Sequence, residues 1–95
     1  MFVVILGYVK PLDQVDHWLN EHVAFLDECY SAGLFIASGR RVPRTGGVIL
    51  ATGDDRDLLD RTLQRDPFKR EGVAEYAIYQ FQATKMQAGL ETFFK

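Results

Sequence analysis

Two histidines are the first residues to consider for chemistry, because imidazole ionises near neutral pH and can both take up and release a proton. His22 follows Trp18 by four positions and precedes Leu26 by four, the spacing of one apolar helix face. His17 lies about 140° around that helix, and we expect it at the surface. His22 is therefore either a core histidine with one hydrogen bond or a general acid or base in a dry cleft.

Asp66 is the second candidate, since a carboxylate that accepts the N–H of a histidine fixes its tautomer and stabilises the imidazolium. Asp66 stands directly before Pro67, and Asp followed by Pro is also a common helix start. The residue therefore either caps a short turn over residues 67–70 or orients a histidine. We expect both roles together only if different carboxylate oxygens serve them.

The single cysteine, Cys29, excludes an internal disulfide and a multi-cysteine metal site. It follows His22 by seven residues, and the helical rise of about 10.5 Å is too long for a thiolate–imidazolium pair. We expect Cys29 to pack in the core. The two histidines lie on different helix faces and the carboxylates gather at helix starts, so we expect no metal site and no other cofactor.

Three arginines, Arg40, Arg41 and Arg44, share one loop rich in Gly and Pro. Residues 40–70 carry eight basic and five acidic side chains, whereas the rest of the chain carries three and eight. The loop is either a solvated hairpin tip or a rim that attracts the carboxylate or phenolate of a substrate.

Length and composition limit the class of protein. The 95 residues predict one domain, 1–95, and 47% hydrophobic with 25% charged residues is typical of a folded globular chain. A net charge of −2 argues against nucleic-acid binding. The apolar residues 2–6 follow no basic segment and are too few for a signal peptide or a membrane span. We therefore expect a cytoplasmic protein without a membrane anchor.

The elements that must position these residues follow from periodicity and turn signals. Residues 2–9, 34–38, 48–52 and 73–83 are expected as strands, and residues 13–32 and 55–65 as helices. Asp13 is expected to cap the first helix and Gly33 to end it. The order βαββαβ predicts a ferredoxin-like α+β fold, in which two helices cover one face of a four-stranded antiparallel sheet.

Strand composition predicts a partner for the second face of this sheet. The first strand places Phe2, Val4 and Leu6 on one face but Val3 and Ile5 on the other, instead of alternating apolar and polar residues. Because the helices cover only one face, a second copy of the chain is the simplest cover for the other. We predict a homodimer with sheet packed on sheet.

An ordered set of segments resembles the YCII-related family over nearly the whole chain. The segments are EHVAFL at 21–26, AGLFIASG at 32–39, GGVIL at 46–50 and DPFKREGV at 66–73. The resemblance implies a dimeric α+β barrel with a His–Asp pair at a cleft beside the sheet. That pair falls on His22 and Asp66, with Ser38 and Gly39 lining the pocket. The chain departs from the family pattern at Arg40, where members often have Pro, and at Leu19, where some carry Arg.

Two hypotheses for function follow. In the first, Asp66 orients His22, and His22 removes a proton from a small cyclic anion held by Ser38, Gly39 and Arg40, which leads to elimination or isomerisation. The resemblance supports it, because a relative removes chloride from a hydroxylated aromatic compound. In the second, the same cleft binds a small metabolite without turnover. A separation of about 3.2 Å or less between the two side chains is needed for the first.

Overall fold

The sheet and its helices follow the expected order. The computed structural model describes residues 1–93, with strands β1 (Phe2–Tyr8), β2 (Phe35–Arg40), β3 (Gly46–Ala51) and β4 (Ala74–Gln80). The helices are α1 (Leu12–Ser31), α2 (Arg56–Leu63) and the short α3 (Pro67–Arg70), and the 3-10 helix η1 (Leu90–Phe93) follows β4. All neighbouring strands pair antiparallel in the order β2-β3-β1-β4. This is the predicted ferredoxin-like βαββαβ arrangement.

Helix α1 carries the buried stripe that positions His22. Its buried side chains are Val15, His22, Phe25 and Cys29, which recur at helical spacing. Val23, the residue after His22, is 44% exposed and lies to one side of this stripe. His17 is exposed, as expected.

The sequence predicted the C-terminal end of α1 correctly but not its N-terminal end. Gly33 has a φ of +74°, the left-handed conformation that favours glycine. The amides of Gly33 and Leu34 donate to the carbonyls of Tyr30 and Cys29, which closes the helix as a Schellman motif. The expected cap at Asp13 was wrong: the N-cap is Pro11, and Asp13 lies in the first turn. There its negative charge still suits the helix dipole.

The second half of the chain shows similar small shifts. Asp55 caps α2 by accepting from the amide of Leu58. Leu59 and Leu63 are buried, whereas Leu58 is 40% exposed. The loop between β2 and β3 is shorter than expected, because β2 continues to Arg40 and β3 begins at Gly46.

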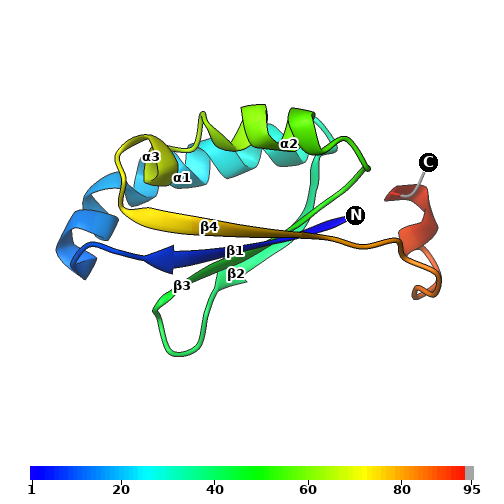
Figure 1. The fold of residues 1–95 in the computed structure, drawn as a ribbon, viewed down its shortest axis with the longest axis horizontal. Helices are drawn as coiled ribbons and strands as arrows, with labels where there is room; N and C mark the ends of the chain where they lie inside the picture. The colour runs from blue at the N-terminus through cyan, green and yellow to red at the C-terminus, as the bar shows by residue number, and fades with distance from the viewer. Residues whose placement is uncertain (94–95) are drawn as a thin grey trace.

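The helices cover one face of the sheet and leave the other bare (Figure 1). Phe2, Val4 and Leu6 of β1 are at most 2% exposed beneath the helices. Val3 and Ile5 of the same strand are only half-buried, and they face away. The bare face also presents Tyr79, which is 60% exposed. The sheet therefore carries apolar residues on both of its faces, as the sequence predicted.

Strand β2 contains an irregularity next to the candidate site. Phe35 pairs with Ala51, but Ala37 already pairs with Leu50, so one extra residue, Ile36, interrupts the register. Beyond this bulge, Ser38 pairs with the buried Ile49. Directly paired residues lie on the same face of a sheet, so Ser38 lies on the helix-covered face. A regular strand would place it on the opposite face from Phe35 and Ile49.

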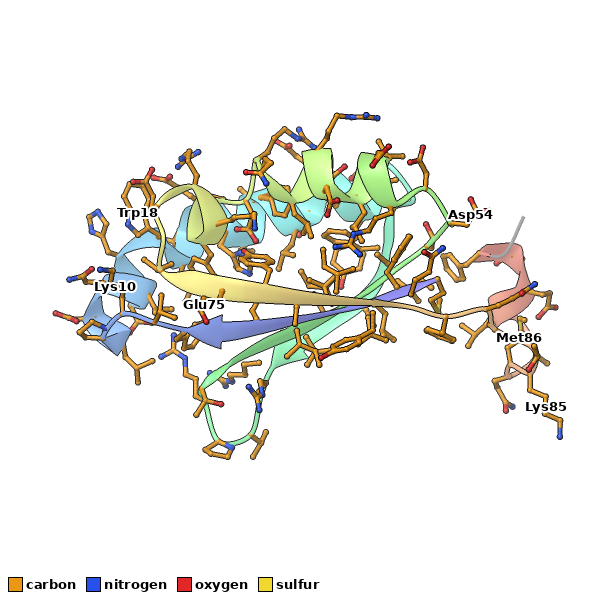
Figure 2. The ribbon with its side chains drawn as sticks, viewed as in Figure 1. Lys10, Trp18, Asp54, Glu75, Lys85 and Met86 are labelled. Carbon is orange, nitrogen blue, oxygen red and sulfur yellow. The ribbon has the colours of Figure 1, made fainter. Side chains whose placement is uncertain are left out.

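The segment after β4 leaves the body of the molecule. Lys85 and Met86 lie on it, beyond the end of the sheet (Figure 2). Its side chains Met86, Leu90 and Phe93 are between 38% and 40% exposed. Phe94, which the sequence suggested as part of an aromatic tail, lies outside the described residues. Among residues 1–93, no helix combines the length and apolarity needed to cross a membrane.

Candidate active site

His22 and Asp66 lie 44 positions apart in the sequence and form a direct hydrogen bond in the fold. The distance between Nδ1 of His22 and Oδ1 of Asp66 is 2.7 Å. Asp66 is 0% exposed and His22 is 9% exposed. The separation lies within the limit of about 3.2 Å set for a histidine and its orienting carboxylate.

Asp66 occupies its place because of a local helix signal. It is the N-cap of α3, with Pro67 at the first helical position, and its Oδ1 accepts from the amide of Phe68 at 3.0 Å. The same oxygen accepts from His22. The expectation that capping and histidine binding need different oxygens was wrong, because one carboxylate oxygen has lone pairs for two donors.

The other oxygen of Asp66 has a partner that the sequence analysis did not identify. The hydroxyl of Tyr76, on β4, donates to Oδ2 of Asp66. The carboxyl group is thus surrounded by three donors: an imidazole, a backbone amide and a phenol. This set suits an ionised carboxylate, which only accepts hydrogen bonds. The histidine must then donate from Nδ1, which leaves Nε2 unprotonated in the neutral ring.

The ring of Phe68 packs flat against the imidazole of His22. The rings of His22 and Phe68 are stacked, with centroids 4.0 Å apart and an interplanar angle of 4°. Tyr8 meets the same Phe68 ring edge-on, with centroids 6.0 Å apart. A fully buried Phe68 therefore supports two polar side chains that reach the surface of one cleft.

The cleft lies beside α1 on the helix-covered face of the sheet and has a volume of about 330 Å³. Leu6, Leu19, Leu26, Ile49 and Phe68 contribute apolar surface, and Tyr8, His22, Ser38 and Arg40 contribute polar groups. An apolar pocket with a few convergent polar groups is typical of a small-molecule site. Since Nδ1 of His22 is bound to Asp66, Nε2 is the ring nitrogen that remains for a ligand.

Ser38, Gly39 and Arg40, the residues expected to contact a substrate, all line this cleft. They lie on β2, opposite the α1 wall that carries His22. Ser38 is anchored by Tyr30 of α1, whose hydroxyl oxygen lies 2.7 Å from that of Ser38. The structure therefore places His22 on one wall of this hollow and Ser38, Gly39 and Arg40 on the other, with the fully buried Asp66 behind His22.

The three arginines of the predicted rim separate in the structure. Arg40 lines the cleft, whereas Arg41 lies in the exposed loop between β2 and β3. Arg44 pairs with Asp16 of α1. Asp16, and to a smaller extent Tyr8, raise the pKa of Arg44 by favouring its charged form. Arg44 thus ties the hairpin to α1, and Arg40 is the cation placed to meet a ligand.

Cys29 packs in the core, as expected, and is 1% exposed. Burial raises the pKa of its thiol to about 11, so the thiolate form of Cys29 is scarce near neutral pH. Within residues 1–93, no group of three or more His, Cys, Asp or Glu side chains is placed to hold a metal ion.

Tyr76, Tyr8 and Phe68 are the residues of this region that sequence reasoning missed. A weak signal exists for Tyr76, because it falls on the same face as Ile78 in the alternating last strand. Alternation places the ring under the helices but does not reveal which buried carboxylate its hydroxyl meets.

The fold matches that of a characterised enzyme. It is similar to 5-chloro-2-hydroxyhydroquinone dehydrochlorinase from Burkholderia phenoliruptrix AC1100, solved in complex with 2,5-dihydroxybenzoquinone. The TM-score is 0.71 at 16% sequence identity, and the match covers 86% of this chain and 94% of that one. At this sequence identity, the similarity establishes the α+β fold of this chain but not its activity.

The chain belongs to the YCII-related family, since the YCII-related domain matches residues 1–82. This confirms the resemblance inferred from the ordered segments. The match ends shortly after β4, and the expected single domain of residues 1–95 stays a prediction. No curated protein sequence matches the chain.

The contacts of Asp66 predict an unusually large loss of stability on truncation. Asp66→Ala removes a cap and leaves His22 and Tyr76 without their acceptor, and we expect a loss of about 3 kcal/mol or more in the free energy of unfolding. Asp55→Ala is the matched control, because Asp55 also caps a helix but its carboxylate has no side-chain partner among residues 1–93. We expect a loss of about 1 kcal/mol there. Equal losses in urea unfolding would show that capping alone explains Asp66.

Proposed function

We propose that this chain is a small enzyme in which His22 acts as the general base on a small, cyclic, oxygenated anion. Asp66 orients His22 and stabilises the imidazolium that forms. Ser38, Gly39 and Arg40 bind the substrate. The observation that carries the proposal is the 2.7 Å hydrogen bond between Nδ1 of His22 and a fully buried carboxylate, at the wall of a cleft.

The arrangement supports proton transfer in particular. A carboxylate behind an imidazole keeps the far nitrogen basic and lowers the free energy of the charged ring, as in other His–Asp pairs. A positioned base of this kind contributes about 10²- to 10⁴-fold in rate. The reaction needs only the side chains of the cleft, so we propose that it uses no cofactor.

The apolar part of the cleft suits a flat ring, and Arg40 suits a negative oxygen on it. Nε2 of His22 takes a proton from a carbon or oxygen of the ring, and the released electron pair forms a new double bond. In an elimination, an anion such as chloride leaves from the neighbouring carbon. In an isomerisation, the imidazolium returns the proton to another carbon. The similarity in fold to a dehydrochlorinase favours the elimination.

Proton abstraction can be tested before the natural substrate is known. The probe is 2,5-dihydroxybenzoquinone, whose ring hydrogens exchange for deuterium when an acid adds a deuteron to the ring carbon and a base then removes the proton from that carbon. In D₂O, we expect the protein to accelerate the loss of their proton NMR signal. His22→Gln and Asp66→Asn should each reduce that acceleration by about 10²-fold or more.

The control for this exchange is His17→Gln, which removes an exposed histidine from the same helix and should leave the rate unchanged. Saturable binding of the quinone without any acceleration of exchange would favour the alternative, a metabolite-binding module without turnover. Acceleration that survives in His22→Gln would refute His22 as the base.

The position of Arg40 at the cleft predicts that the ligand is an anion. Arg40→Gln should weaken binding of the dihydroxybenzoquinone anion by about tenfold, the loss of one charge-assisted hydrogen bond. Arg41→Gln is the matched control, because Arg41 is the next residue but lies in the exposed loop. The dissociation constants are measured by NMR titration. Equal effects of the two variants would assign the arginines a general electrostatic role.

We also propose that the working unit is a homodimer joined through the bare face of the sheet. That face carries apolar side chains from three strands and from the residue just beyond β4: Val3, Ile5, Val48, Leu50, Tyr79 and Phe81. Contiguous apolar surface of this kind marks an interface. We keep the cytoplasmic location and the absence of a nucleic-acid partner as predictions from composition.

The dimer predicts a mass of twice the chain by size-exclusion chromatography with light scattering at micromolar concentration. Tyr79→Glu should shift it to a monomer, since it places a charge on the apolar face that we propose is buried in the dimer. Glu75→Gln, on the same strand, is the control and should remain a dimer. A wild-type monomer would contradict this proposal.

A further inference from the structure

Tyr76 lies on the opposite side of Asp66 from His22. Its hydroxyl donates to Oδ2 of Asp66, while Oδ1 serves His22 and the amide of Phe68. We infer that Tyr76 is a positioning residue, which holds Oδ2 so that Asp66 stays an acceptor, the proton of His22 stays on Nδ1, and Nε2 stays free for the cleft. A role of Tyr76 in catalysis rests on the proposed function, whereas its effect on the tautomer of His22 does not.

The inference follows from what a buried carboxyl group does when one oxygen has no donor. Burial favours the neutral acid, whose own hydroxyl becomes a donor. A neutral Asp66 would no longer require Nδ1 of His22 to carry the proton, and it would no longer stabilise an imidazolium. A phenol on Oδ2 removes this alternative, because a phenol is a much weaker acid than a carboxylic acid and keeps its own proton.

The surroundings of Tyr76 keep it a donor. Burial, together with the Asp66 carboxylate, raises the pKa of the phenol far above its ordinary value. Tyr8 on β1 acts in the same direction. The ammonium of Lys69, 4.9 Å from the ring centroid, favours the ionised phenol, but burial and Asp66 outweigh it. The hydroxyl therefore stays protonated near neutral pH.

The register of the sheet fixes the phenol in this position. Tyr76 pairs with Leu6 of β1, and Leu6 pairs with Gly47 of β3. Leu6 is 2% exposed, and Gly47 lines the cleft. One row of paired residues thus runs from the cleft to Tyr76, and the β1–β4 pairing keeps the phenol on the helix-covered face, where it meets Asp66.

The test is the tautomer of His22 in Tyr76→Phe, measured by two-bond ¹H–¹⁵N NMR of the ¹⁵N-labelled protein with no substrate present. In the wild type we expect the Nδ1–H tautomer and a slowly exchanging Nδ1 proton. In Tyr76→Phe we expect part of the population to change to the Nε2–H tautomer and the Nδ1 proton signal to be lost through exchange with water. Tyr79→Phe is the matched control, on the same strand but the opposite face, and should match the wild type.

An unchanged tautomer and an unchanged Nδ1 proton in a natively folded Tyr76→Phe would overturn the inference. If the variant does not fold, the inference is tested on the wild-type protein instead. With ¹³Cζ-labelled tyrosine, the Tyr76 signal should show no ionisation over the pH range in which an ordinary tyrosine ionises, about pH 10. A Tyr76 that ionises in that range has no carboxylate partner, and this result would equally overturn the inference.

The exchange assay with 2,5-dihydroxybenzoquinone separates this inference from the proposed function. If both hold, Tyr76→Phe lowers the maximal exchange rate and leaves the dissociation constant of the quinone unchanged. If the wild type shows no exchange but Tyr76→Phe changes the His22 tautomer, the proposed function fails and the inference stands. If His22→Gln abolishes exchange but Tyr76→Phe changes neither rate nor tautomer, the proposed function stands and the inference fails.

Discussion

A carboxylate with no exposed surface is the constraint on which this structure depends. Taking the charge of Asp66 out of water is unfavourable by several kcal/mol, on the order of the whole stability of a small domain, unless donors surround it. Those donors come from α1, from the first turn of α3 and from β4. The same three contacts hold both helices against the edge strand. The Asp66 carboxylate, which joins these elements, therefore also fixes the tautomer of His22.

This double use explains why a histidine stands at the centre of an apolar stripe. Helix α1 needs a buried face to pack, and His22 occupies a position that a leucine would fill in an ordinary core. Its aromatic ring retains part of the packing through the stack on Phe68. Its Nδ1 is satisfied by Asp66, and the hollow beside α1 leaves the other nitrogen accessible to a ligand. The cleft has residues of α1 on one side and residues of β2 and β3 on the other.

Much of the fold could be predicted from the sequence, because periodicity and turn residues act locally. The order of elements, the end of α1 at Gly33 and the two apolar faces of β1 all follow from such signals. The pairing of His22 with Asp66 does not, since 44 positions separate them. A family resemblance supplied it. Tyr76 remained hidden because the pattern of its strand indicates only the face on which its ring lies. The sharing of one Asp66 oxygen by two donors depends on geometry that no spacing encodes.

The bulge in β2 is another feature that the sequence does not announce, since Ile36 and Ala37 are ordinary strand residues without a glycine or proline. Its consequence concerns the register of the strand more than residue type. If the same residues formed a regular strand paired from Phe35, Phe35 would keep its place in the core, and Ser38 and Arg40 would face the bare side of the sheet. A relative could keep both residues, in the same order and on the same strand, and still lack the polar wall of the cleft. In comparing members of this family, the pairing register of β2 therefore matters more than a substitution, because it separates the ability to fold from the ability to recognise a ligand.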